Sequence, residues 1–171
     1  LKMFTHAEGG EVNGQNMKDG DISVFIRIGA DYAQNFYEYE IPLKVTEWGA
    51  TLPSDIWPTE NEIDLELNAL KEVKLQRDRE YRNSGLPNTE KFTLAKGKAN
   101  ISVVGSPNLG NVRTILIGIR NPKKRLISDI ADDGMEKCAE VWVNELRLTE
   151  FDQRGGWAAN ARVAAQLADF A

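Results

Sequence analysis

The feature that most constrains the fold is an alternating run at residues 21–29. One side of the run carries Ile22, Val24, Ile26 and Ile28, and the other side carries Ser23, Phe25 and Arg27. A two-residue period of this kind is typical of a strand with one buried face. After a glycine-containing turn, Tyr37, Tyr39 and Ile41 alternate with two glutamates, so the two runs are predicted to pair as an antiparallel hairpin. Pro42 predicts that the second strand lies at a sheet edge or bulges there, because proline cannot donate a ladder hydrogen bond.

A helical period replaces the alternation after Pro58. Thr59 and Glu62 have the spacing of a capping box. Apolar residues then recur at helical spacing, at Ile63, Leu67, Leu70 and Val73. Basic residues followed by Asn83-Ser84-Gly85 supply the signal that ends the helix. The sequence therefore predicts one α-helix, over about residues 60–83.

Short apolar runs separated by glycine, proline and asparagine make up most of the remaining chain. They lie at residues 2–8, 92–94, 99–104, 112–120 and 139–148. Several short strands with such breaks are typical of a sandwich. The predicted fold is mainly β, a jelly-roll-like antiparallel β-sandwich at residues 1–150 with one inserted α-helix. The pattern does not predict the strand order.

The C-terminal segment, residues 151–171, alternates in a different way. Its apolar positions are Trp157, Ala159, Ala161, Val163, Ala165 and Leu167, with polar residues between several of them. The run has about the length of a strand that crosses a membrane, so we predict a segment that leads into a barrel strand. A helix is the alternative, because alanine favours helices and is depleted in strands.

Charge and reactive side chains exclude several classes of function. A net charge of -5 and a pI near 5.0 provide no basic surface for phosphates, so nucleic acid is not an expected partner. His6 and Cys138 are the sole residues of their types, which removes the usual zinc and cysteine–histidine templates. Glu38 and Glu40 lie too close along one strand to flank a glycosidic bond. The sequence therefore predicts a protein that is not an enzyme.

Aromatic side chains are the candidates for a binding site. Tyr37, Tyr39, Trp48 and Trp57 can form a platform for a sugar or for an extended protein segment, because flat rings provide a large contact area. The two tryptophans flank a proline-containing loop, where exposure is expected. Packing in the core and at strand edges is the alternative, and the alternation of the two tyrosines with glutamates favours it for them.

No cofactor is predicted, with a structural calcium ion as the one alternative. The run at residues 141–146 resembles the final strand of carbohydrate-binding jelly rolls, which often hold calcium through acidic groups near both chain ends. Glu8, Asp19, Asp21 and Glu145 would be the oxygen ligands. The alternative is that these four are solvated surface carboxylates.

A long stretch near the C-terminus resembles a known family. It covers Ala-Glu-Val-Trp-Val-Asn-Glu-Leu-Arg-Leu-Thr-Glu-Phe-Asp at residues 139–152 and Gly-Gly-Trp-Ala-Ala-Asn-Ala-Arg-Val at residues 155–163. Earlier motifs agree in the same order: residues 35–40, Ile-Trp-Pro at 56–58, and Ser-Pro-Asn-Leu-Gly at 106–110. Together they resemble the SprA family, called Sov in some relatives.

The resemblance implies a role in the type IX secretion system and in gliding motility of Bacteroidetes, where SprA proteins form a large outer-membrane barrel. This chain would be one non-catalytic structural and interaction domain of the translocon, cut from a longer protein. An extracellular position is expected, because a folded insertion fits the longer extracellular connections of such barrels better than their short periplasmic turns. The implied partners are PorV, the plug protein, secreted cargo proteins and the remainder of the barrel. A carbohydrate-binding module at the cell surface is the alternative function.

Overall fold

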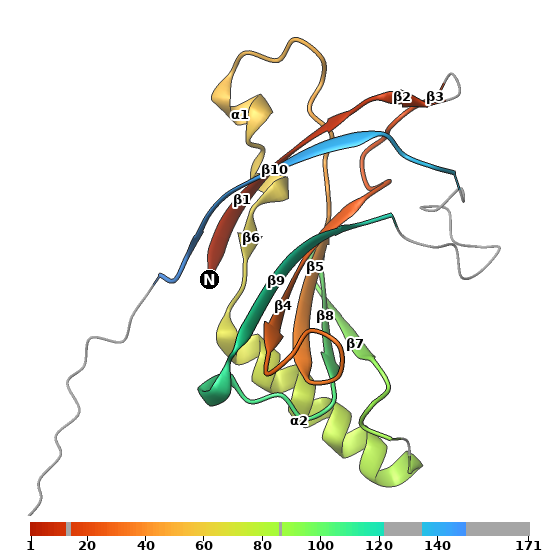
Figure 1. Cartoon of the computed structure of the whole chain (residues 1–171), viewed down its shortest axis with the longest axis vertical. Helices are drawn as coiled ribbons and strands as arrows, with labels where there is room; N and C mark the ends of the chain where they lie inside the picture. Colours follow the sequence, from red (N-terminus) through yellow and green to blue (C-terminus); the bar gives the residue numbers. More distant parts are fainter. Residues whose placement is uncertain (13–14, 86, 122–134, 150–171) are drawn as a thin grey trace, which may run out of the picture.

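The computed structural model describes residues 1–12, 15–85, 87–121 and 135–149. Its elements in chain order are β1 (Lys2–Gly9), β2 (Glu11–Val12), β3 (Gln15–Asn16), β4 (Ser23–Gly29), β5 (Phe36–Pro42), α1 (Pro53–Ile56), the 3-10 helix η1 (Thr59–Asn61), β6 (Ile63–Asp64), α2 (Leu67–Ser84), β7 (Phe92–Lys96), β8 (Ala99–Val104), the 3-10 helix η2 (Leu109–Asn111), β9 (Thr114–Arg120) and β10 (Ala139–Arg147) (Figure 1). The predicted C-terminal segment at 151–171 lies outside the described residues.

The prediction of a mainly β fold is confirmed. The larger sheet has five antiparallel strands in the order β7-β8-β5-β4-β9, and the smaller has three in the order β10-β1-β6. The pair β2-β3 adds a short hairpin. Two antiparallel sheets around one core are consistent with a β-sandwich.

The predicted hairpin is confirmed as β4 and β5, which pair without a break from Ser23↔Pro42 to Gly29↔Phe36. The prediction that Pro42 marks a sheet edge is wrong, because β5 is the middle strand of five. The pairing of β5 with β8 ends at Glu40↔Asn100. Pro42 therefore lies beyond the reach of β8, where its missing N–H costs no ladder bond.

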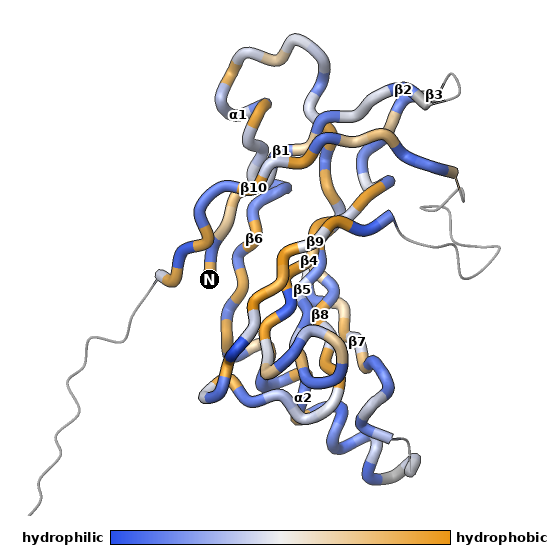
Figure 2. The backbone as a smooth tube through the Cα atoms, in the orientation of Figure 1, coloured by the Kyte–Doolittle hydropathy of each residue, from blue (hydrophilic) through white to orange (hydrophobic). Residues whose placement is uncertain are grey.

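The core lies between one face of the five-stranded sheet, the inner face of β1 and the helix α2. Buried apolar side chains on these elements include Val24, Ile26, Tyr39, Ile41, Ile101, Met3, Ala7, Leu70 and Val73. Figure 2 shows hydrophobic positions gathered along β4 and β9, whereas α2 is largely hydrophilic. The helix therefore contributes one narrow apolar stripe, which packs on β7 and β8.

The predicted helix exists, but its predicted start is wrong. Residues Thr59–Asn61 form a 3-10 turn, Ile63–Asp64 pair with β1, and α2 begins only at Leu67. Ile63 and Leu65 are both buried, and an extended chain points alternate residues to the same side, so strand pairing buries both. The end of the helix is as predicted: Gly85 adopts a left-handed φ of 68° and its N–H bonds to Tyr81.

Candidate functional site

A tight turn at residues 47–50 holds Trp48 away from the rest of the chain. The Ala50 N–H donates to the Glu47 carbonyl at 3.2 Å, and Gly49 between them has a φ of +83°, which suits glycine. Trp48 is 100% exposed. The whole ring is thus available for contact, and tryptophan is enriched among the residues that dominate binding energy at protein interfaces.

The chain that leads into this turn is anchored by hydrogen bonds. The amide of Asn61 accepts from the Lys44 N–H at 2.7 Å and donates to its carbonyl at 2.8 Å. The Val45 N–H donates to Asp19 at 2.7 Å, and the Thr46 N–H donates to the Ala7 carbonyl at 2.8 Å. The base of the turn is thus fixed to β1 and η1, so Trp48 extends from a rigid support.

A groove of about 770 Å³ lies beside the turn. The end of β1, the start of β10 and residues 46–50 form its walls, with Ile56 of α1 contributing an apolar side chain. Figure 1 shows these segments, far apart in sequence, meeting at the end of the molecule that carries α1. The size is within the range of grooves that bind small molecules or short chain segments.

Three carboxylates line this groove, and no lysine or arginine does so among the described residues. They are Glu8 on β1, Glu47 in the turn and Glu140 on β10. Glu8 and Glu140 are directly opposite each other in the β1–β10 ladder. Like charges in this position repel and destabilise the pair. The groove therefore has a negative potential next to an exposed aromatic ring.

His6 lies behind the groove and connects three of its lining residues to one another. Its Nδ1 lies 2.5 Å from the Ile56 carbonyl and 3.0 Å from the Thr46 hydroxyl, and its Nε2 lies 2.9 Å from the Glu8 carboxylate. The ring is 5.6 Å from that of Trp57. The buried imidazole is fully engaged, so its role here is to position Glu8 and the chain behind it.

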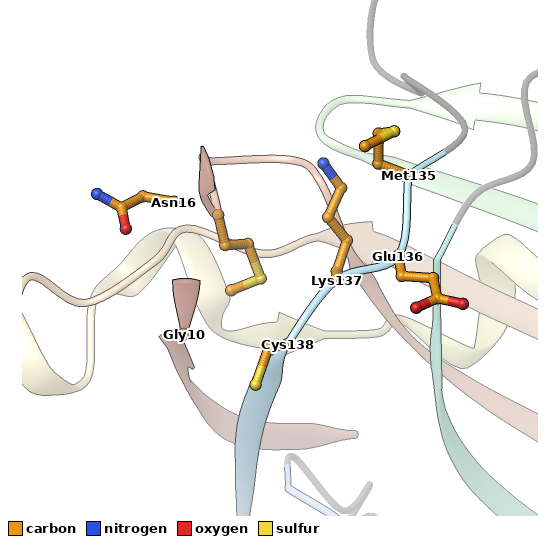
Figure 3. Close-up of a pocket in the computed structure, with 7 residues that line it drawn as sticks. Gly10, Asn16, Met135, Glu136, Lys137 and Cys138 are labelled. Carbon is orange, nitrogen blue, oxygen red and sulfur yellow. The ribbon is translucent and has the colours of Figure 1, made fainter. Parts of the chain in front are cut away.

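A smaller pocket adjoins the groove where the chain enters β10 (Figure 3). Gly10 and Cys138 line both cavities. The Gly10 N–H donates to the Cys138 carbonyl at 2.8 Å, and a Cβ at Gly10 would lie 2.9 Å from the Cys138 sulfur. Lys137 forms an ion pair with Asp21 at 3.1 Å. With a volume of about 10 Å³, the pocket has room for about one water molecule.

A second charged cluster lies on the face of the five-stranded sheet opposite α2. The Glu38 side chain is 0% exposed and accepts hydrogen bonds from Arg27 at 2.6 Å, from Arg120 at 3.0 Å and from Lys91. Burial alone would raise the pKa of Glu38, but the hydrogen bonds from Arg120, Lys91 and Arg27 outweigh it and lower the pKa to about 2. This carboxylate is ionised and fully paired, which indicates a structural role.

The aromatic rings beside this cluster hold its arginines in place. The Arg120 guanidinium lies 4.4 Å from the Phe25 ring centre, and that of Arg27 lies 4.3 Å from the Phe36 ring centre. A Cβ at Gly118 would lie 2.5 Å from the Phe25 ring, so the absence of a side chain there leaves room for the ring.

Comparison with known proteins identifies the family. A family model described as a motility related/secretion protein, SprA_N, matches residues 1–171. The chain belongs to the SprA_N family. The resemblance read from the sequence is thereby confirmed over its full length. No curated protein matches the chain.

The four aromatic residues predicted to bind are not brought together in this SprA_N domain. Tyr37 and Tyr39 are buried in the core, and their hydroxyls approach the carbonyls of Pro107 and Asp64. Trp57 is half-buried beside His6, whereas Trp48 alone among the four is fully exposed. Any binding platform therefore centres on Trp48, and the binding role itself stays a prediction.

The carboxylates considered for calcium do not converge in the SprA_N domain. Asp19 accepts from the Val45 N–H, Asp21 pairs with Lys137, Glu8 contacts His6, and Glu145 pairs with Arg147. Within the described ranges, no three acidic, histidine or cysteine side chains are grouped to hold a metal ion. Calcium binding stays untested, and these contacts lend it no support.

The sequence did not single out Glu47 or Glu140 as groove residues. The Glu-Trp-Gly-Ala motif at 47–50 is a turn signal that indicates exposure of Trp48. Nothing local indicates that Glu140 faces Glu8, because that follows from the ladder register. Among the helices that the structure describes, none is long and apolar enough to cross a membrane.

Proposed function

We propose that the chain is a non-catalytic structural and interaction domain of the SprA-type outer-membrane translocon, supporting type IX protein secretion and gliding motility. The observation that carries the proposal is the fully exposed Trp48 at the rim of a groove. Tryptophan is enriched among the residues that dominate binding energy at protein interfaces. The family description, motility and secretion, supports the same cellular role.

The proposed partners are other type IX subunits such as PorV or the plug protein, secreted cargo proteins and the remainder of the SprA barrel. The proposed location is the outer membrane, with the domain on the extracellular side. Support comes from the size of the folded region, since the extracellular connections of such barrels are longer than their periplasmic turns.

The state of the titratable groups supports a non-catalytic role. The imidazole of His6 is buried and engaged through both nitrogens, and Glu38 is held ionised by three cations. General acid–base catalysis needs groups poised to exchange protons with a substrate. Because His6 and Glu38 already bind internal partners, their contacts stabilise the fold.

The experiment that tests the proposal introduces Trp48→Ala into the full-length protein. We expect the barrel to assemble at the surface while secretion of a type IX cargo protein falls. Tyr32→Ala is the matched control, because Tyr32 is an exposed aromatic residue outside the groove. Normal cargo secretion by Trp48→Ala cells would contradict the assignment of the contact to this groove.

Carbohydrate binding at the cell surface is the second candidate function. The observation that favours it is the same exposed ring of Trp48 next to carboxylates, because sugars stack on aromatic faces while their hydroxyls donate to acidic groups. Titration of the domain with cell-surface glycan tests it. Saturable binding that disappears in Trp48→Ala supports this function, and its absence leaves protein contact as the better account.

A further inference from the structure

The carboxylates of the groove have no lysine or arginine partner among the described residues. Several acids elsewhere do have such partners: Glu38 pairs with three cations, and Glu60 pairs with Lys44 at 3.0 Å. Among the described residues, no lysine or arginine forms an ion pair with Glu47 or Glu140. Within the described ranges, the Glu8 carboxylate pairs with the imidazole of His6. The groove therefore concentrates negative charge that the described chain does not neutralise.

The register of β1 and β10 makes the negative charge of the groove unfavourable for the stability of the sheet. Glu8 and Glu140 face each other directly across β1 and β10, where like charges destabilise a sheet. Both side chains lie on the face of the sheet that carries the groove. A cation placed between them would relieve the repulsion, so its binding is favoured beyond a single ion pair.

The other walls of the groove suit the remaining parts of a basic side chain. Trp48 offers an aromatic face to a lysine ammonium or an arginine guanidinium. Ile56, Gly9 and Ala139 provide apolar surface for the methylene stem. A lysine or arginine side chain can therefore contact the aromatic ring, the apolar walls and the carboxylates at the same time.

From this arrangement we infer that the groove binds a lysine or arginine side chain presented by an extended segment of a partner protein. The inference rests on the proposed interaction role and names the chemistry of the partner. The net charge of -5 acts in the same direction, since it attracts a basic segment at long range.

The test titrates the 171-residue chain with two short peptides and follows backbone amide signals by NMR. The first peptide is acetyl-Gly-Leu-Lys-Leu-Gly-amide, and the second replaces lysine by norleucine, which has the same stem without the charge. We expect saturable shifts around the groove with the lysine peptide and binding weaker by about fivefold or more with norleucine. Added salt is expected to reduce the difference.

Variants separate the groove from the rest of the surface. Trp48→Ala and Glu140→Gln are expected to weaken binding of the lysine peptide, whereas Tyr32→Ala and Glu90→Gln, exposed residues outside the groove, leave it unchanged. Glu140→Gln should also unfold at an equal or higher urea concentration, because it removes the repulsion with Glu8. Lower affinity without lower stability distinguishes a lost contact from a damaged fold.

Three results would overturn the inference: equal affinity for both peptides, no saturable shift with lysine, or shifts that persist unchanged in Glu140→Gln. Failure of the inference can be told apart from failure of the proposed function. If Trp48→Ala abolishes cargo secretion while neither peptide binds, the interaction role stands and the basic ligand is wrong. If secretion is also normal, both fall.

Discussion

Replacing Glu38 by glutamine tests the charged cluster on the five-stranded sheet. The carboxylate is fully buried and accepts hydrogen bonds from Arg27, Lys91 and Arg120. Its pKa falls from 4.5 to about 2 because these bonds outweigh the effect of burial. Linkage then assigns the ionised group about 3 kcal/mol of folding stability at neutral pH. Leaving three cations without their central charge is expected to cost a similar amount.

The pH dependence provides a second, independent signature. A depressed pKa contributes stability that is fully present above the unfolded value of 4.5 and is lost as the pH falls through about 2. The difference between the parent chain and Glu38→Gln should therefore be about 3 kcal/mol at pH 7 and about 1.4 kcal/mol at pH 3. Below pH 2 the two proteins should have nearly the same stability.

Urea unfolding followed by circular dichroism at these pH values measures the difference. Glu72→Gln is the matched control, because Glu72 forms an exposed ion pair with Lys96 at 3.5 Å. Such a pair is worth less than about 1 kcal/mol. A loss below about 1 kcal/mol in Glu38→Gln, or a loss that does not change with pH, would refute the reasoning.

Three further substitutions test buried contacts in different parts of the fold by urea unfolding. Asn61→Ala removes both buried amide bonds to Lys44 and is expected to cost about 2 kcal/mol; an unchanged midpoint would show that the loop does not depend on them. Gly118→Ala places a methyl group against the Phe25 ring and is expected to cost about 1–3 kcal/mol, and stability equal to the parent would mean that the ring moves freely. Arg77→Met leaves the Gly105 carbonyl, which follows β8, without its buried donor and is expected to lower the free energy of unfolding by about 2 kcal/mol. A neutral or stabilising effect would contradict this.

Strands were predictable from the sequence where alternation is local. The runs at 21–29 and 99–104 reappear as β4 and β8 because one face of each is buried and the other polar. The start of α2 was not predictable from spacing, because pairing of Ile63 with Met3 on β1 overrides the helical pattern at that point. Local pattern thus predicts an element, and long-range pairing sets where it begins.

Features of the candidate site were likewise predictable where they depend on local sequence and not where they depend on long-range pairing. Exposure of Trp48 follows from a local turn signal, since glycine at position 49 permits the backbone that the turn requires. Burial of Tyr37 and Tyr39 agrees with their alternation on β5. The negative groove was not predictable, because it depends on the register that places Glu140 opposite Glu8.

The central claim, that this domain takes part in secretion through its contacts, is tested most directly by deleting residues 1–148 from the full-length protein. Secretion of a type IX cargo protein is measured, with surface assembly of the barrel checked in the same cells. The account predicts an assembled barrel with cargo retained inside the cell. Normal secretion through a barrel that lacks the domain would contradict it.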